Sequence, residues 1–289
     1  MTTTTERFGT LPTLPTIELP ACLEFLKLKN FPLKVYPPVY EAPRPIKDTL
    51  YIYGPGYRNS WGSFDVDCLQ IQMYMKFCGI DVQVVNSNEP DASPSGKLPF
   101  LATVTGAVYH GEQIHQWIQD MASFSKDRQA DDQGKAFITL AKTKLHAAML
   151  FSMWLEPLNY TYTSKAYYDH IPAPVNSWLA YKKQNDVVQT LLVDRDILVR
   201  EEIYQEAEQA LEALSVKLGD ATYFFNASEP TWMDVVVFSY LHVILGAPQI
   251  TDASIAEVEK RQAHALRGLV RKHENLVRYA KNIYEQYLK

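Results

Sequence analysis

The hydrophobic period changes once along this chain, and the change separates two kinds of architecture. Between residues 48 and 121 short β-prone runs alternate with helical patterns, whereas from residue 136 onward every apolar pattern has a helical period. Helices are predicted over 63–79 and 114–121, and strands at 50–53, 82–85, 98–104 and 107–109. The order strand–helix–strand, then strand–strand–helix, predicts a small α/β domain ahead of an all-helical domain.

Local signals support the α/β half, whose element order is typical of a thioredoxin-like domain. Ser63 is expected to cap the first helix, with Asp65 and Asp67 in the first turn. Gly96 permits a left-handed turn before the third strand. Pro99, at the start of that strand, is a candidate for a cis peptide bond.

The most apolar helix of the chain is predicted over 231–245. It opens with Thr-x-x-Asp, in which the Thr231 hydroxyl and the Asp234 carboxylate satisfy the first amides of the helix. The surrounding apolar stretch is shorter than the roughly 18 residues that cross a bilayer, so a soluble chain is expected. Further helices are predicted at 136–155, 176–189, 195–218 and 255–288 (one or two helices), with a Tyr-rich loop containing Pro172 and Pro174 after the first of them.

Residues 1–47 differ in composition from the rest, because they hold eight of the 17 prolines and a single glycine. Proline fixes φ and donates no hydrogen bond, so an extended arm is expected. Two interpretations stay open: a strap packed on its own domain, or an arm that docks on a partner. The predicted domains are therefore an arm at 1–47, a thioredoxin-like domain at 48–124 and an all-helical domain at 125–289.

Charge and cysteine content exclude some functions. Lys and Arg number 28 against 33 Asp and Glu, a net charge of −5, which argues against a nucleic-acid partner. Three cysteines with no CxxC pair fit a reducing compartment, and the N-terminus lacks the apolar core of a secretory signal. Residues 260–289 hold eight Lys or Arg against two Glu. This basic stretch is interpreted either as a solvated helix face or as a surface for anionic headgroups or an acidic partner.

The search for catalytic and metal-binding motifs finds little. His110, Glu112 and His115 lie close in sequence, but their spacing across a strand-to-helix join does not suit a metal site. No catalytic residue, cofactor or metal ion is expected. An aromatic cluster is interpreted as core or interface; its members are Tyr160, Tyr162, Tyr167, Tyr168 and Trp178.

The thioredoxin-like order, the proline before the third strand and the Thr-x-x-Asp helix together resemble the glutathione S-transferase fold. Four segments within it resemble the metaxin family specifically: 61–69 (WGSFDVDCL), 93–100 (SPSGKLPF), 176–184 (NSWLAYKKQ) and 223–226 (YFFN) followed by Pro230-Thr231. The proline-rich lead, which ends in FPLKVYPP, is similar to that of the smaller peripheral metaxin-like subunit of the fungal mitochondrial sorting and assembly machinery.

This resemblance implies a non-catalytic receptor and assembly subunit, held peripherally on the cytosolic face of the mitochondrial outer membrane. The implied partners are the β-barrel insertase core protein, a second metaxin-like subunit and β-barrel precursor polypeptides, recognised through their sorting signal. Candidate contacts to a partner or precursor are Phe31, Tyr36, Tyr40, Trp61 and Lys97.

Two other function classes compete with this interpretation. The first is a glutathione transferase, but the positions at which such enzymes carry a Glu/Asp-Ser pair hold His110 and Gly111 here. Candidates for the thiol-activating residue are Ser60, Ser63 and Cys68, and the nearby Asp65 and Asp67 work against an activated cysteine. The second is a soluble scaffold of the transferase fold.

Overall fold

The computed structural model describes residues 45–57, 60–122 and 132–289. Residues 44–289 form one compact unit, which is described below. The expected arm at 1–47 therefore lies almost wholly outside the described residues, as do the candidate contacts Phe31, Tyr36 and Tyr40. The boundary expected at residue 124 also falls outside them and remains a prediction.

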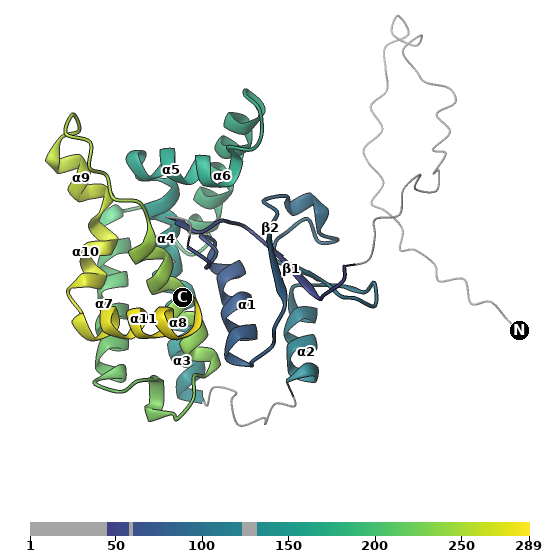
Figure 1. Cartoon of the computed structure of the whole chain (residues 1–289). Coiled ribbons are helices and arrows are strands. Elements are labelled where there is room, and N and C mark those ends of the chain that lie inside the picture. The colour runs from purple at the N-terminus through teal and green to yellow at the C-terminus, as the bar shows by residue number, and fades with distance from the viewer. Residues whose placement is uncertain (1–44, 58–59, 123–131) are drawn as a thin grey trace, which may run out of the picture. The chain divides into compact units, whose positions relative to one another are not determined.

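A four-stranded sheet forms the α/β region (Figure 1). Its spatial order is β2-β1-β3-β4, in which β1 runs parallel to β2 and antiparallel to β3, and β4 runs antiparallel to β3. Leu50, Val84, Leu101 and Tyr109 are paired across it and share one face. The strands are β1 (Thr49–Ile52), β2 (Gln83–Asn86), β3 (Phe100–Ala102) and β4 (Val108–His110).

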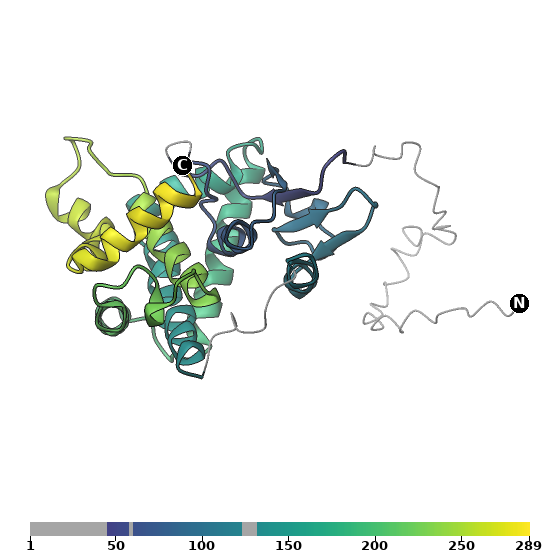
Figure 2. The same ribbon diagram turned by 60° about the horizontal axis from the view of Figure 1, so that its bottom comes forward.

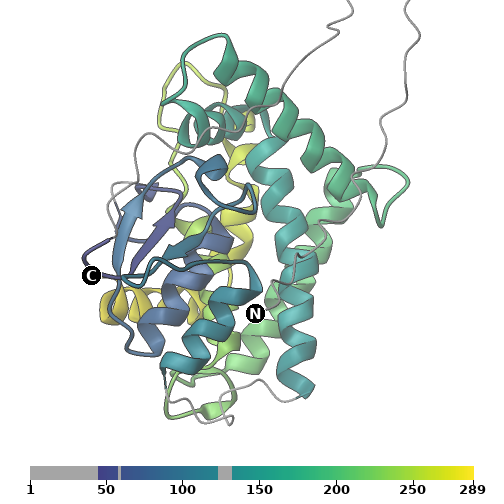
Figure 3. The same ribbon diagram turned by 90° about the vertical axis from the view of Figure 1, so that its right-hand side faces the viewer.

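Helices α1 (Val66–Phe77) and α2 (Glu112–Met121) pack on this face of the sheet, as Figure 3 shows from the side. The predicted α/β order is confirmed. The third strand is shorter than expected. It begins at Phe100 and not at residue 98, because Pro99 has no amide hydrogen to donate to a neighbouring strand. The Leu98–Pro99 peptide bond is cis, as expected. Gly96 has the expected left-handed backbone, with φ +65°.

The expectation that Ser63 caps α1 is wrong. The cap is Asp65, whose Oδ1 accepts a hydrogen bond from the Cys68 amide at 3.0 Å. The Ser63 hydroxyl instead accepts from the Asp65 amide at 3.1 Å and donates to the Tyr53 carbonyl at 2.5 Å. A carboxylate is at least as good an acceptor at this position as a hydroxyl, so the residue two places later takes it.

The region beyond residue 132 is helical, as expected (Figure 1). The Tyr-rich segment, however, forms a helix and not a loop, because Pro157 at its start fixes a helical φ. The C-terminal stretch forms three helices where one or two were expected. The elements are α3 (Asp132–Leu140), a π-helical turn η5 (Ala141–Leu145), α4 (His146–Trp154), α5 (Pro157–Tyr168), α6 (Val175–Leu192), α7 (Arg200–Leu218), η6 (Phe224–Asn226), α8 (Trp232–Gly246), α9 (Glu257–Ala263), α10 (Ala265–Arg271) and α11 (Glu274–Tyr287).

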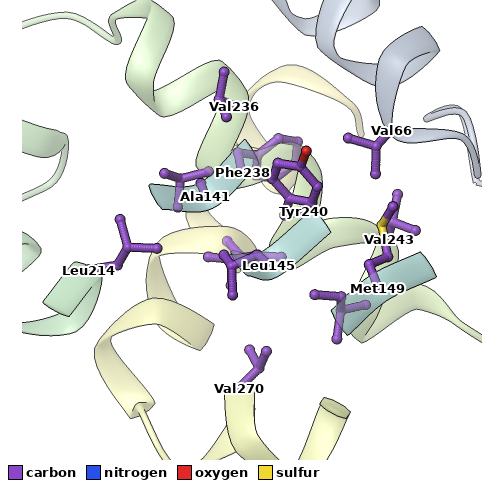
Figure 4. Packing of buried hydrophobic residues seen from close by; sticks show 14 of the residues in the cluster. Val66, Ala141, Leu145, Met149, Leu214, Val236, Phe238, Tyr240, Val243 and Val270 are labelled. Atoms are coloured by element: carbon purple, nitrogen blue, oxygen red, sulfur yellow. The ribbon is translucent and has the colours of Figure 1, made fainter. Parts of the chain in front are cut away.

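Helix α8 is the centre of the helical core. Phe238, Tyr240 and Val243 lie among side chains from α1, η5, α4, α7 and α10 (Figure 4). The predicted capping box at Thr231 and Asp234 is confirmed, with the Thr231 amide donating to Asp234 at 2.8 Å. A helix buried on all sides needs its first amides satisfied within the protein, and this local motif supplies that acceptor.

Helix α1 belongs to two cores at once. Its Leu69 and Met73 pack in the helical core, while Cys68, Ile71 and Met75 pack against the sheet. This double burial joins the α/β region to the helical region. None of the helices in the described ranges has the length and apolar content that a membrane crossing requires.

Candidate functional site

The candidates for a thiol-activating residue lie in the turn between β1 and α1 (Ser60 and Ser63) and in the first turn of α1 (Cys68). The Ser63 hydroxyl is buried and committed to the two hydrogen bonds described above. Cys68 is fully buried, and burial raises the pKa of its thiol well above the ordinary value. A thiol held in its protonated form is a poor nucleophile, and an engaged hydroxyl has no hydrogen left to offer a ligand. Ser60 and Ser63 both line an open hollow, and the Ser60 hydroxyl accepts a hydrogen bond from the Gly62 amide at 3.3 Å.

The start of α2 offers no hydroxyl at the positions where the transferase pair is expected. Gly111 is the N-cap, with φ +52°, and no side chain caps the helix. Burial lowers the pKa of His115, whose ring packs edge-on against Trp232 at 4.8 Å between centroids. Across the described ranges, no three His, Cys, Asp or Glu side chains gather in a way that would bind a metal ion.

A groove of about 570 Å³ lies between the β1–α1 turn and helices α8, α10 and α11. Figure 2 shows α11 and the C-terminus beside this turn, where Leu288 approaches Gly62. Trp61 stands at the groove with 78% of its surface exposed. We call this hollow the α8–α11 groove; its lining is Tyr57, Ser60, Trp61, Ser63, Phe64, His242, Val243, Leu245, Gly246, Arg271, Val277, Ala280, Lys281, Tyr284 and Lys289.

The α8–α11 groove is electropositive. Arg271, Lys281 and Lys289 line it and no Asp or Glu does. His242 adds no charge at neutral pH, because burial lowers its pKa to about 4. Apolar and aromatic side chains supply most of the remaining lining, so the groove combines an apolar floor with three cations.

A second hollow of about 170 Å³ lies on the other side of Phe64, between α1 and helices α4 to α6. Its polar lining includes Asp65 and His146. Asp65 accepts a hydrogen bond from the Tyr167 hydroxyl at 2.8 Å, and His146 Nδ1 lies 3.2 Å from the Tyr240 hydroxyl. The first contact ties the start of α1 to α5 and the second joins α4 to α8, so we interpret the hollow as a structural junction.

Helix α6 exposes large apolar side chains at helical spacing. Val175 is 48% exposed, Trp178 60% and Tyr181 59%, and we call these three residues the α6 aromatic face. The predicted aromatic cluster is thus divided: Tyr167 is buried in the core, whereas Trp178 and Tyr162 are exposed. Exposed aromatic residues grouped on one helix are typical of a protein-binding surface.

The structure separates the candidate contacts among the described residues. Trp61 lines the α8–α11 groove, whereas Lys97 is exposed in the loop before β3 and does not line it. Reasoning from sequence missed Tyr181 and the convergence of Arg271 with Lys289. The signal for the second was present in the basic stretch, but only the folded chain shows which of its cations meet.

Residues 68–184 match the Tom37 family, described as "Outer mitochondrial membrane transport complex protein", and residues 207–283 match "Glutathione S-transferase, C-terminal domain". Among solved structures, glutathione transferase F7 from Populus trichocarpa is 12% identical with a TM-score of 0.46, over 82% of this chain and 93% of that chain. The chain has a glutathione S-transferase-like fold, with a small mixed sheet followed by a helical region.

Curated relatives define the family more narrowly. Metaxin-1 of Macaca fascicularis is 31% identical over 250 residues, covering 80% of this chain and 73% of that protein. Metaxin-3 of Xenopus laevis is 32% identical over 202 residues, and the match spans 63% of each chain. Metaxin-2 of Homo sapiens is 29% identical over 68% of this chain and 77% of that protein. The chain belongs to the metaxin family, a family of outer mitochondrial membrane transport proteins.

Proposed function

We propose that this chain is a non-catalytic receptor and assembly subunit, bound peripherally to the cytosolic face of the mitochondrial outer membrane. In this role it binds β-barrel precursors through their sorting signal and passes them to the barrel insertase core, beside a second metaxin-like subunit. Family membership supports the membrane address and the role in protein transport.

The α6 aromatic face is the observation that carries the partner-binding part of the proposal. Its Trp178 and Tyr181 lie in the segment 176–184, where the resemblance to metaxins is specific, and the whole face lies within the Tom37 match. Trp and Tyr dominate binding energy at protein interfaces, because they bury a large rigid surface at low entropic cost. We assign this face to the insertase core.

The non-catalytic part of the proposal is supported by the α1 and α2 termini. Of the three candidates for activating a thiol, Ser63 has a hydrogen-bonded hydroxyl and Cys68 is buried as a neutral thiol, which leaves Ser60 at the groove. Gly111 offers no side chain to a glutamyl group at the start of α2. These features favour a transferase fold used as a binding scaffold.

The test is native purification of the full chain from mitochondria after mild solubilisation. We expect a β-barrel membrane protein to accompany the wild type. The change Trp178→Ser with Tyr181→Ser should weaken binding of this partner roughly a thousandfold and so abolish its recovery, because two hot-spot residues contribute about 2 kcal/mol each. Val216→Ser, at a side chain that is 78% exposed on α7, is the matched control and should retain the partner.

Three results would contradict the proposal. A monomer without a partner would remove the assembly role, and a purely cytosolic pool would instead favour the soluble scaffold. Retention on immobilised glutathione with thiol-transfer activity would favour the glutathione transferase interpretation.

Precursor binding is tested separately, by photo-crosslinking the purified chain to a peptide that carries the last strand of a β-barrel precursor, with a scrambled peptide as control.

A further inference from the structure

The basic side chains of the stretch 260–289 differ in the partners that they contact. Three of its cations form ion pairs with residues elsewhere on the surface: Lys260 with Glu257 at 2.8 Å, Lys272 with Glu208 at 2.5 Å and Arg278 with Asp220 at 3.1 Å. Arg267 is buried and donates to the Ala247 carbonyl. These four side chains serve the fold and are not available to a ligand.

Of the four cations that remain, Arg261 donates to the Glu257 carbonyl at 3.3 Å and lies outside the groove, and the other three converge on one place. Within the residues that the structure describes, Arg271 and Lys289 form no ion pair, and both line the α8–α11 groove. Lys281 joins them with 71% of its side chain exposed and a single distant contact, 4.0 Å from Glu285. An adjoining hollow of about 280 Å³ shares Arg271 and is also lined without Asp or Glu.

The apolar part of the groove matches a bilayer interface. Trp61 stands exposed at the groove, above a lining that includes Tyr57, Val243 and Tyr284. Tryptophan prefers the headgroup level of a membrane, and basic side chains beside it attract anionic lipids. A concave site of this size suits one lipid headgroup better than the flat surface of a folded partner.

Because the chain as a whole is acidic, its attraction to an anionic membrane depends on this local basic patch. A chain with a net charge of −5 is repelled on average by an anionic surface. Attraction therefore depends on a region where cations outnumber acidic neighbours, and the α8–α11 groove is such a region: three cations line it, no Asp or Glu of the described residues does, and Glu285 lies 4.0 Å from Lys281. The same imbalance would orient the chain, with the groove toward the membrane.

We propose that the α8–α11 groove binds the headgroup of an anionic phospholipid. Arg271, Lys281 and Lys289 hold the headgroup phosphate, and Trp61 inserts into the membrane interface. This contact is separate from the α6 aromatic face, so it does not rest on the protein partner assigned to that face.

The first test is co-sedimentation of the purified full chain with vesicles of phosphatidylcholine, with or without phosphatidylinositol. We expect binding only to the anionic vesicles. A basic residue near such a surface contributes roughly fivefold, so Arg271→Gln, Lys281→Gln and Lys289→Gln together should lower partitioning about a hundredfold. The control, with the same charge change, is Lys76→Gln, Lys135→Gln and Lys165→Gln, three exposed side chains on α1, α3 and α5 that do not line the groove.

The second test measures depth with phosphatidylcholine brominated on its acyl chains, which quenches tryptophan fluorescence on contact. Trp61→Phe should abolish most of the quenching, whereas Trp178→Phe, which removes the other exposed indole of the described residues, should leave it unchanged. All variants should melt at the wild-type temperature, because the substituted side chains lie on the surface.

Three outcomes would overturn the proposal. One is equal vesicle binding by the groove variant and its control. Another is quenching that depends on Trp178 and not on Trp61, because this result would place the α6 aromatic face, and not the α8–α11 groove, at the membrane. The last is a groove variant that binds vesicles normally but no longer retains an acidic peptide, which would make the groove a protein-binding site.

Discussion

Asp234 is the residue whose replacement tests the account of the helical core most directly. Its carboxylate is fully buried and accepts four hydrogen bonds: from the amide and hydroxyl of Thr231 at 2.8 Å each, from the Phe224 amide at 3.0 Å and from the Tyr279 hydroxyl at 2.9 Å. One acceptor thus joins the start of α8 to η6 and α11. Helix α8 in turn supplies part of the α8–α11 groove.

The magnitude follows from the donors left behind. Asp234→Ala strands the amides of Thr231 and Phe224 and the Thr231 hydroxyl, whereas the Tyr279 hydroxyl keeps the backbone carbonyl of residue 234 at 3.3 Å; each stranded donor costs roughly 1–3 kcal/mol. Burial raises the pKa of this carboxyl despite its four donors, so removing the carboxylate relieves part of that penalty. We expect a net loss of about 4 kcal/mol for Asp234→Ala. Asp234→Asn keeps one acceptor oxygen and should cost about half as much.

Guanidinium unfolding at 25 °C measures these differences, and thermal melting provides an independent check. For a chain of this size 1 kcal/mol corresponds to roughly 2–4 °C, so Asp234→Ala should melt about 10 °C lower. Tyr279→Phe removes one donor without leaving another unpaired and should cost about 1 kcal/mol. A cost below 1 kcal/mol for the alanine variant, or an equal cost for alanine and asparagine, would refute the reasoning.

Three further substitutions test other features of the fold. Burial lowers the pKa of His242 to about 4 in the folded chain, against a value near 6.5 in the unfolded chain. The stability that comes from keeping this imidazole neutral is therefore fully present above pH 6.5 and is lost as the pH falls toward 4. His242→Phe should remove about 2 kcal/mol of the stability loss measured between pH 7.5 and pH 5, and an unchanged pH profile would contradict this. Arg200→Met should cost about 3 kcal/mol in guanidinium unfolding. In the wild type the Glu156 carboxylate lies 2.7 Å from the Arg200 Nε, and the variant leaves this carboxylate buried without its cation. Adding Glu156→Gln should restore most of the lost stability. Gly56→Ala would place a Cβ against the Gly62 carbonyl oxygen, so the β1–α1 turn must shift. The free energy of unfolding should fall by about 1–3 kcal/mol, and the tryptophan emission spectrum should change. An alanine variant with wild-type melting would show that the turn is not packed as described.

Features encoded by adjacent residues were predictable from the sequence. The Thr231–Asp234 capping box, the left-handed turn at Gly96 and the order of strands and helices along 48–121 all depend on local sequence, and all are confirmed. The cap of α1 was assigned to the wrong residue because Ser63 and Asp65 are both good acceptors. The competition between them is decided by the contact of Ser63 with Tyr53, ten residues away.

Features that depend on tertiary placement were not predictable. The ion pairs that neutralise Lys272 and Arg278 join residues more than fifty positions apart, so no reading of the basic stretch could single out Arg271 and Lys289. Helical periodicity could not show that Trp178 and Tyr181 face outward, because an aromatic stripe at that spacing is more often buried.

The double burial of α1 bears on how the chain comes apart. Because Leu69 and Met73 belong to one core while Ile71 and Met75 belong to the other, neither core can open without stripping one side of the same helix. The two regions should therefore melt in a single cooperative transition, with the amides of α1 exchanging as slowly as those of α8. A fragment cut from either half would expose half of that interface and would not survive as an independent folding unit.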